Sequence, residues 1–195
     1  MEKPANTDHP IHDLLRRRWS PRAFSQRPVP SEALQSILEA ARWAPSAMNE
    51  QPWRFVVATR EDPEAFEALL GCLVDGNRVW ACRAPVLVLA AVKMDFERNG
   101  RPNRHAWYDV GQAVAHLAIQ ATDLGLFVHQ MGGFDREKAR VAFALPDGCE
   151  PVAVVALGYG DDPETLPESL REREVAPRGR RPAKESLLPS RRRTS

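Results

Sequence analysis

Apolar residues recur along this chain with two different periods, and the alternation of these periods predicts its secondary structure. Apolar positions three and four residues apart predict a short helix around 11–15 and longer helices over 31–42, 62–73, 107–124 and 135–143. Short continuous apolar runs predict strands over 54–59, 85–92, 126–128 and 151–157. Strands that are apolar along their whole length are typical of sheets covered by helices, so we expect an α/β or α+β layered fold.

The predicted helix over residues 107–124 is the longest, and it is apolar around most of its circumference. Its apolar positions are Val110, Ala113, Val114, Leu117, Ala118, Ile119, Ala121 and Leu124. A helix with so little polar surface lies at the centre of a fold, packs against a sheet, or is shared with a partner subunit.

The composition changes after Gly160. Residues 161–195 are rich in Pro, Arg and Glu and show no amphipathic period. We therefore divide the chain into one domain over residues 1–160 and a C-terminal arm over 161–195. The arm is either disordered or extended over another surface, and its last residues, with the Arg191–Arg193 run, are expected to be disordered and solvated.

Charge and composition exclude several classes of protein. Lys and Arg number 27 against 26 Asp and Glu in 195 residues, so no global field favours nucleic acid or an acidic membrane. The apolar run Ala84–Val92 is too short to span a bilayer, and the N-terminus lacks a signal-peptide pattern. Three cysteines without CxxC spacing favour a reduced, cytoplasmic protein. His9 and His12 lack further ligands at suitable spacing, so we expect no metal site.

Two segments carry candidate chemistry. Arg18, Ser20 and Arg22 alternate, so in an extended segment they face the same way and could hold a phosphate, whereas Arg16 and Arg17 suit the polar end of the first helix. One helix later, the segment 44–53 offers a hydroxyl, two amides and an indole, from Ser46, Asn49, Gln51 and Trp53. Together they predict a site for a ligand with an anionic tail and a flat polar head.

The segments Arg18–Phe24 and Ala44–Trp53 resemble the two N-terminal signatures of the nitroreductase family of FMN-dependent oxidoreductases. Further resemblances follow in the same order, in Asp109–Gly125, Met131–Asp135, Pro151–Gly158 and Arg178–Pro182, so the similarity covers about residues 11–186. The resemblance implies an α+β three-layer fold with a mostly antiparallel sheet of four or five strands. It also implies a homodimer with FMN at the interface and the C-terminal arm swapped onto the partner.

The resemblance implies that FMN contacts fall on these residues: Arg18, Trp19, Ser20, Arg22, Pro45, Ser46, Ala47, Asn49, Asn77, Met131, Gly132, Gly133, Arg178 and Arg180. Arg178 and Arg180 match phosphate contacts, Arg22 matches a cation near flavin N1, and Gly132 matches the backbone amide facing N5. Asn77 matches an asparagine directed at the flavin, although an asparagine that simply ends a turn is the alternative. His129 would lie close to the flavin, with no assigned role.

The implied activity is hydride transfer from NADH or NADPH through FMN to a nitroaromatic, a quinone or a free flavin. No protein acid or base is required, because the cofactor supplies the chemistry. Two alternatives stay open: a flavin-binding protein without turnover, and a divergent branch that performs dehalogenation or flavin breakdown. The short segment 95–107 lacks room for the inserted helices of larger family members, which predicts an open pocket and argues against dehalogenation under a lid.

Overall fold

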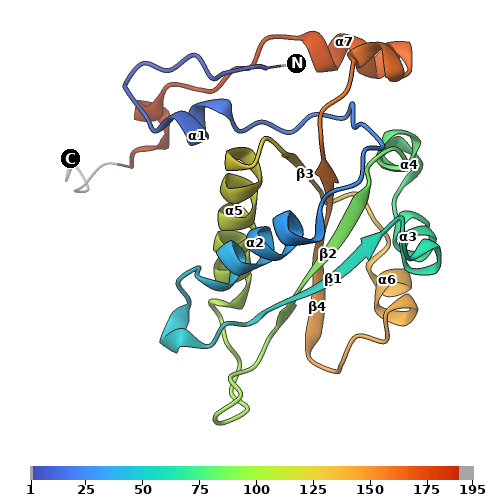
Figure 1. Ribbon diagram of the computed structural model, residues 1–195. Coiled ribbons are helices and arrows are strands. Elements are labelled where there is room, and N and C mark those ends of the chain that lie inside the picture. Colours follow the sequence, from blue (N-terminus) through green and yellow to red (C-terminus); the bar gives the residue numbers. More distant parts are fainter. Residues whose placement is uncertain (1, 189–195) are drawn as a thin grey trace, which may run out of the picture.

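The computed structural model describes residues 2–188, and these form an α+β fold around one sheet (Figure 1). The sheet has four strands in the order β1-β2-β4-β3, and every neighbouring pair is antiparallel. The strands are β1 (Trp53–Thr59), β2 (Val86–Lys93), β3 (Phe127–Met131) and β4 (Cys149–Gly158). The predicted fold class is therefore confirmed, with four strands rather than five.

Helices cover both faces of the sheet. On one face lie α2 (Ser31–Arg42) and α5 (Ala106–Asp123), which pack on a core that includes Val88 and Val155. On the other face lie α3 (Pro63–Leu70), α4 (Asp75–Ala81) and α6 (Arg136–Ala142), around Leu87 and Leu89. Alternate residues of β2 thus enter opposite cores, which explains why this strand is apolar along its whole length.

Helix α5 is not buried on every side. One face packs against the sheet and α2, whereas Trp107, Tyr108 and Leu124 on the outer side are 39%, 70% and 38% exposed. The short helix α1 (Asp13–Arg17) lies near the C-terminal end of α5. Ile11, just before α1, and Leu15, within it, are also exposed. An apolar surface of this kind is typical of an interface.

The arm continues beyond β4 and returns to its own chain. After Leu166, which is buried, α7 (Glu168–Val175) and the segment to Arg178 lie against the N-terminal segment and α1 (Figure 1). The swap of the arm onto a partner stays a prediction. Helix α7 has no apolar stripe, which is why the sequence pattern does not predict it. The Arg191–Arg193 run lies outside the described residues.

Candidate active site

The segment Arg18–Arg22 is anchored to strand β3 through His129. The Nδ1 atom of His129 lies 2.8 Å from the carbonyl oxygen of Pro21, and its ring lies 4.5 Å from that of Trp80. Burial is the main reason why the pKa of His129 is lowered to about 4, and the positive charge of Arg22 lowers it further. The imidazole is therefore neutral at pH 7, and its Nδ1–H donates to Pro21 because a carbonyl can only accept.

The C-terminal arm holds the same segment from the other side. Glu174 of α7 accepts hydrogen bonds at Oε1 from the backbone amides of Arg22 and Ala23, at 2.8 and 3.1 Å. The Arg178 guanidinium donates to the backbone carbonyls of Lys3, Arg16 and Arg18. The predicted phosphate-binding segment is thus fixed by groups far away in the sequence.

A cleft of about 580 Å³ opens beside this junction, between the N-terminal segment and the arm. Its lining includes Arg18, Arg178, Arg180 and Arg181, with Asp8 as its single carboxylate. Burial, and then the neighbouring charge of Arg180, lower the pKa of Arg18. Arg18 and Arg180 make no ion pair with a carboxylate among residues 2–188. Such a cluster of cations is suited to a phosphate.

Strand β3 leads from His129 to the glycine turn. Asn77 lies in the first turn of α4, and its Nδ2 donates to the carbonyl of Gly133 at 3.1 Å. A Cβ at Gly133 would come within 2.9 Å of Asn77 Nδ2, whereas a Cβ at Gly132 would meet no atom within 4 Å. Asn77 therefore does not end a turn but fixes this one, and Gly132 leaves its backbone open to a ligand.

Two of the predicted contacts are core side chains. Trp19 is 7% exposed and its ring packs edge-on against Phe127, with centroids 6.0 Å apart. Met131 is 2% exposed and belongs to the core on the α3 side of the sheet. In the single chain these two residues present little more than backbone to a ligand.

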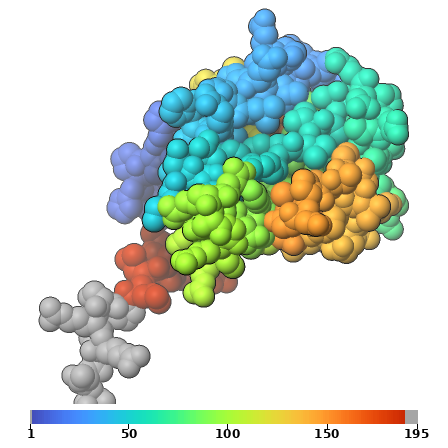
Figure 2. Space-filling model, turned by 90° about the horizontal axis from the view of Figure 1, so that it is seen from below, coloured from blue at the N-terminus to red at the C-terminus, as the bar shows by residue number. Residues whose placement is uncertain are grey.

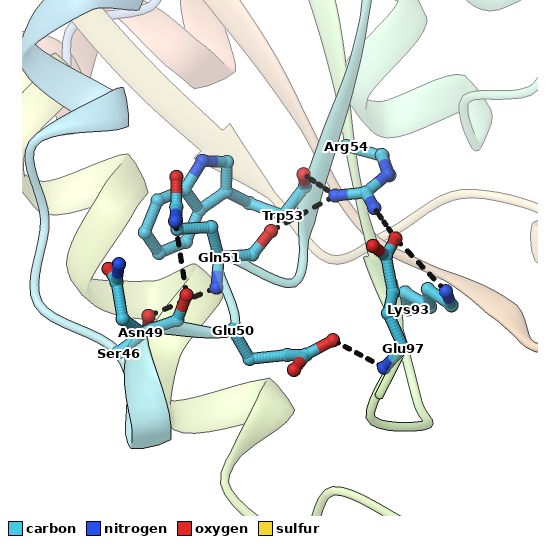
Figure 3. A network of polar contacts seen from close by, with 8 residues as sticks. All are labelled: Ser46, Asn49, Glu50, Gln51, Trp53, Arg54, Lys93 and Glu97. Carbon is cyan, nitrogen blue, oxygen red and sulfur yellow. Dashed lines mark hydrogen bonds and ion pairs between the residues drawn. The ribbon is translucent and has the colours of Figure 1, made fainter. Parts of the chain in front are cut away.

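The second predicted segment forms a strained, exposed loop, Ser46–Gln51, around the short 3₁₀ helix η1 (Ala47–Asn49) (Figure 3). Met48, Asn49 and Gln51 all have positive φ values near 55° (54°, 56° and 52°). Ser46 Oγ accepts from the Gln51 amide at 3.0 Å, and the Asn49 side chain makes no hydrogen bond among residues 2–188. Left-handed backbone in non-glycine residues is typical of functional loops.

This loop also borders the open segment that precedes α5. Glu50 Oε1 accepts from the amide of Glu97 at 2.7 Å, and the Glu97 carboxylate pairs with Arg54 and Lys93 (Figure 3). Lys93, followed by Arg54, lowers the pKa of Glu97. Residues 94–105 contain no helix, as the short segment predicts, and they lie at the surface in lime green beside cyan residues near 50 in Figure 2.

The two candidate segments meet opposite ends of α5. The Ala47 amide donates to Asp109 in the first turn of α5, at 3.0 Å, whereas Thr122 in its last turn shares a pocket with Arg17 and Trp19. Thirteen residues of α-helix span about 20 Å. The structure therefore brings Arg18, Ser20, Arg22, Arg178 and Arg180 together near one end of α5 and leaves Pro45, Ser46, Ala47 and Asn49 near the other. Asn77, Gly132 and Gly133 form a separate group that strand β3 and His129 connect to the arginine segment.

Sequence reasoning missed the groups that hold these segments. Glu174 is one of many charged residues in the arm, and no local pattern distinguishes it from its neighbours. For Asp109, which is 2% exposed, the sequence does contain a weak signal. A buried carboxylate in the first turn of a largely apolar helix requires a hydrogen-bond partner, and the Ala47 amide is that partner.

Comparisons with known proteins agree with this fold. The nitroreductase family, as described by its sequence profile, matches residues 15–159. A relative from Stenotrophomonas maltophilia (strain R551-3), provisionally named NADH dehydrogenase/NAD(P)H nitroreductase, is 30% identical over 83% of this chain and 90% of its own. The crystal structure of an FMN-containing oxidoreductase superposes with a TM-score of 0.90 at 37% identity, covering 96% of this chain and 95% of that one.

A provisionally named nitroreductase from Desulfovibrio desulfuricans, solved in complex with FMN, is 28% identical and superposes with a TM-score of 0.71. That match covers 95% of this chain and 99% of the other. The chain belongs to the nitroreductase family and is an oxidoreductase. Over the part of the chain that the structure describes, no helix is long and apolar enough to cross a membrane, and no cluster of acidic, His or Cys side chains could hold a metal ion.

Proposed function

We propose that this protein is an FMN-dependent oxidoreductase that transfers hydride from NADH or NADPH to an electron-poor acceptor such as a nitroaromatic, a quinone or a flavin. The observation that carries the proposal is the arginine-lined cleft at Arg18, Arg178 and Arg180, joined through the Pro21–His129 contact to the open backbone at Gly132. The FMN named in two structural relatives supports the same cofactor.

The residues present fit FMN at both of its ends. The cleft supplies cations without carboxylate partners for a phosphate, with Ser20 hydrogen-bonded to Arg18 at 3.2 Å. The open Gly132 lets a flat ring approach the backbone, and Arg22 supplies a cation at the base of the same segment. When bound, FMN supplies hydride transfer, which no side chain of this protein can perform.

The protein's own contribution is binding, orientation and electrostatics. Arg18 and Arg180 would hold the phosphate, while the Gly132 amide would donate toward the ring. Arg22 would favour negative charge on the reduced ring, and a charge-assisted contact of this kind contributes roughly 1.5–3 kcal/mol. No general acid or base is required in this scheme, which agrees with a neutral His129 that already donates to Pro21.

A complete site would need two copies of the chain. The Ser46–Gln51 loop is separated from the arginine cleft by most of α5, about 20 Å. The outer side of α5 exposes Trp107 and Tyr108, so a partner packed there could bring its own loop to the cleft. We therefore propose a homodimer in which each site combines the cleft of one protomer with the loop of the other.

The dimer is tested by Ala115→Arg, which places a charge on the exposed face of α5. We expect this variant to sediment as a monomer and also to bind FMN more weakly than the wild type. Val141→Arg is the matched control, because Val141 is 80% exposed on α6, on the other face of the sheet. A monomeric wild-type protein that binds FMN fully would overturn the dimeric site.

The cofactor and activity are tested by adding FMN to the purified protein and recording its absorption spectrum, followed by anaerobic addition of NADH and then NADPH. The expected result is a retained flavin band that bleaches and returns with a nitroaromatic or a quinone. A retained band that neither nucleotide bleaches would support a binding protein without turnover, or a divergent branch. Loss of the flavin on desalting would reject the cofactor.

A further inference from the structure

Glu174 is the most deeply buried acidic side chain near the candidate site. It is 1% exposed, whereas the other glutamates of the arm in the described chain are exposed, and it contacts the segment around Arg22. Its Oε1 atom accepts from two successive backbone amides, those of Arg22 and Ala23. The arm thus reaches the predicted flavin-binding segment through one carboxylate.

The second oxygen of Glu174 has no hydrogen-bond partner among residues 2–188. Oε2 is fully buried, and the nearest cation is Arg22 Nη1 at 4.0 Å, beyond hydrogen-bonding distance. Burying a carboxylate with half of its bonding capacity unused is costly. Glutamine would serve the two amides equally well without a buried charge, so the hydrogen bonds alone do not explain a glutamate here.

The negative charge itself has one neighbouring cation that matters for the site. Arg22 is half-buried, with a side chain 28% exposed, so its interaction with Glu174 is only weakly screened by solvent. Lys3 also approaches, but its ammonium donates to the backbone carbonyls of Glu174 and Ala176 and not to the carboxylate. Burial lowers the pKa of Lys3 and the Glu174 charge counteracts this, so the carboxylate acts on Lys3 as well. Of the two cations, Arg22 is the one that lies in the predicted flavin-binding segment.

We propose that Glu174 is a positioning residue of the flavin site, which fixes the backbone at Arg22 and reduces the positive field that Arg22 presents to the flavin. The inference rests on the proposed function, because it requires Arg22 to face the flavin ring. A weaker field stabilises the anionic reduced flavin less, so Glu174 keeps the bound cofactor a stronger reductant. Glu174 would thus adjust the reducing power of the site without touching the flavin itself.

The test compares Glu174→Gln and Glu174→Ala in the full chain, with Glu172→Gln as the matched control. Glu172 lies on the same helix two residues earlier and is exposed. The readouts are the dissociation constants of oxidised and of reduced FMN, measured by anaerobic titration, together with the melting temperature of each apoprotein.

We expect Glu174→Gln to bind oxidised FMN as the wild type does and to bind reduced FMN about tenfold more tightly. That change corresponds to a rise of about 30 mV in the two-electron midpoint potential. Glu174→Ala also loses the amide contacts, so we expect about tenfold weaker binding of oxidised FMN, which the Gln variant restores. Glu172→Gln should change neither constant.

An unchanged ratio of the two constants in Glu174→Gln, with FMN bound, would overturn the inference and leave the proposed function standing. If both Glu174 variants melt at a lower temperature while the ratio of the two dissociation constants stays as in the wild type, Glu174 has a purely structural role. That result would overturn the inference too. Failure of the wild-type chain to bind FMN would overturn both. If Glu174→Ala does not fold, the Gln variant decides alone.

Discussion

The Arg18–Arg22 segment is held by side chains from strand β3 and from the C-terminal arm, both distant in the sequence, whereas the Ser46–Gln51 loop is held mainly by contacts at the surface. The first segment is fixed by His129 of β3, Glu174 of α7 and Arg178 of the arm. The second has one buried contact, to Asp109, and three residues with positive φ. The proposed phosphate end of the site is thus held by contacts to distant parts of the chain, and the end that would face an acceptor is exposed and strained. This division would separate cofactor binding from substrate choice.

The largest expected effect concerns His129 and would show that the Arg18–Arg22 segment depends on a neutral histidine. Its pKa is lowered from 6.5 to about 4, so between these values the unfolded chain binds a proton that the folded chain does not. The free energy of unfolding should therefore fall as the pH falls from 6.5 to 4, by about 3 kcal/mol, with no further contribution below 4. Urea unfolding at several pH values measures this loss.

His129→Asn is expected to remove most of that pH dependence while keeping a donor toward Pro21. His105→Gln, which removes an exposed imidazole before α5, is the control. An acid-induced loss of the same size in His129→Asn would assign the pH dependence to other groups.

The next effect tests whether the arginine cleft holds the phosphate. Arg18→Ala should weaken the binding of oxidised FMN by about 10- to 100-fold. This loss corresponds to the removal of one charge-assisted hydrogen bond, which contributes roughly 1.5–3 kcal/mol. Arg17→Ala is the matched control, because Arg17 is the preceding residue and pairs with Asp13 at 3.7 Å. Fluorescence titration of the apoprotein measures both constants. Equal losses in the two variants would indicate a general effect of charge and not a phosphate site.

The two glycines of the turn should separate stability from cofactor binding. Gly133→Ala places a Cβ 2.9 Å from Asn77 Nδ2 and 3.0 Å from Val74 Cγ2, so we expect a loss of about 1–3 kcal/mol in the free energy of unfolding. Gly132→Ala meets no atom and should leave stability within about 0.5 kcal/mol, yet weaken FMN binding at the exposed backbone. If Gly132→Ala binds FMN normally, the ring does not approach this turn closely.

The smallest effect concerns strain in the exposed loop. Met48 has a φ of 54° and is 74% exposed, so Met48→Gly should relieve backbone strain and raise the free energy of unfolding by up to about 1 kcal/mol. Ala47→Gly, one residue earlier and without a positive φ, should lower it instead. Denaturant unfolding of the two variants measures the difference. A loss of stability in both would mean that the loop is not strained.

The amino-acid sequence by itself determined most of the layers of this protein, although it did not predict α4 or α7. Helix α2 begins and ends as its apolar period predicts, and the predicted helix over 107–124 differs from α5 by one residue at each end. Each predicted strand is present, although β3 extends three residues beyond the apolar run, to Met131. These elements could be predicted because burial on one or both faces imposes a period on the residues themselves.

The types of residue at the candidate site were also readable, because cations at alternating positions and a loop of amides indicate their chemistry locally. Only the tertiary structure decided which of these groups meet. Glu174 and His129 reach the Arg18–Arg22 segment from 152 and 108 residues away, and α5 separates it from the Ser46–Gln51 loop. A hydrogen bond between residues so far apart leaves no period in the sequence, because it depends on how the sheet, the arm and α1 pack together.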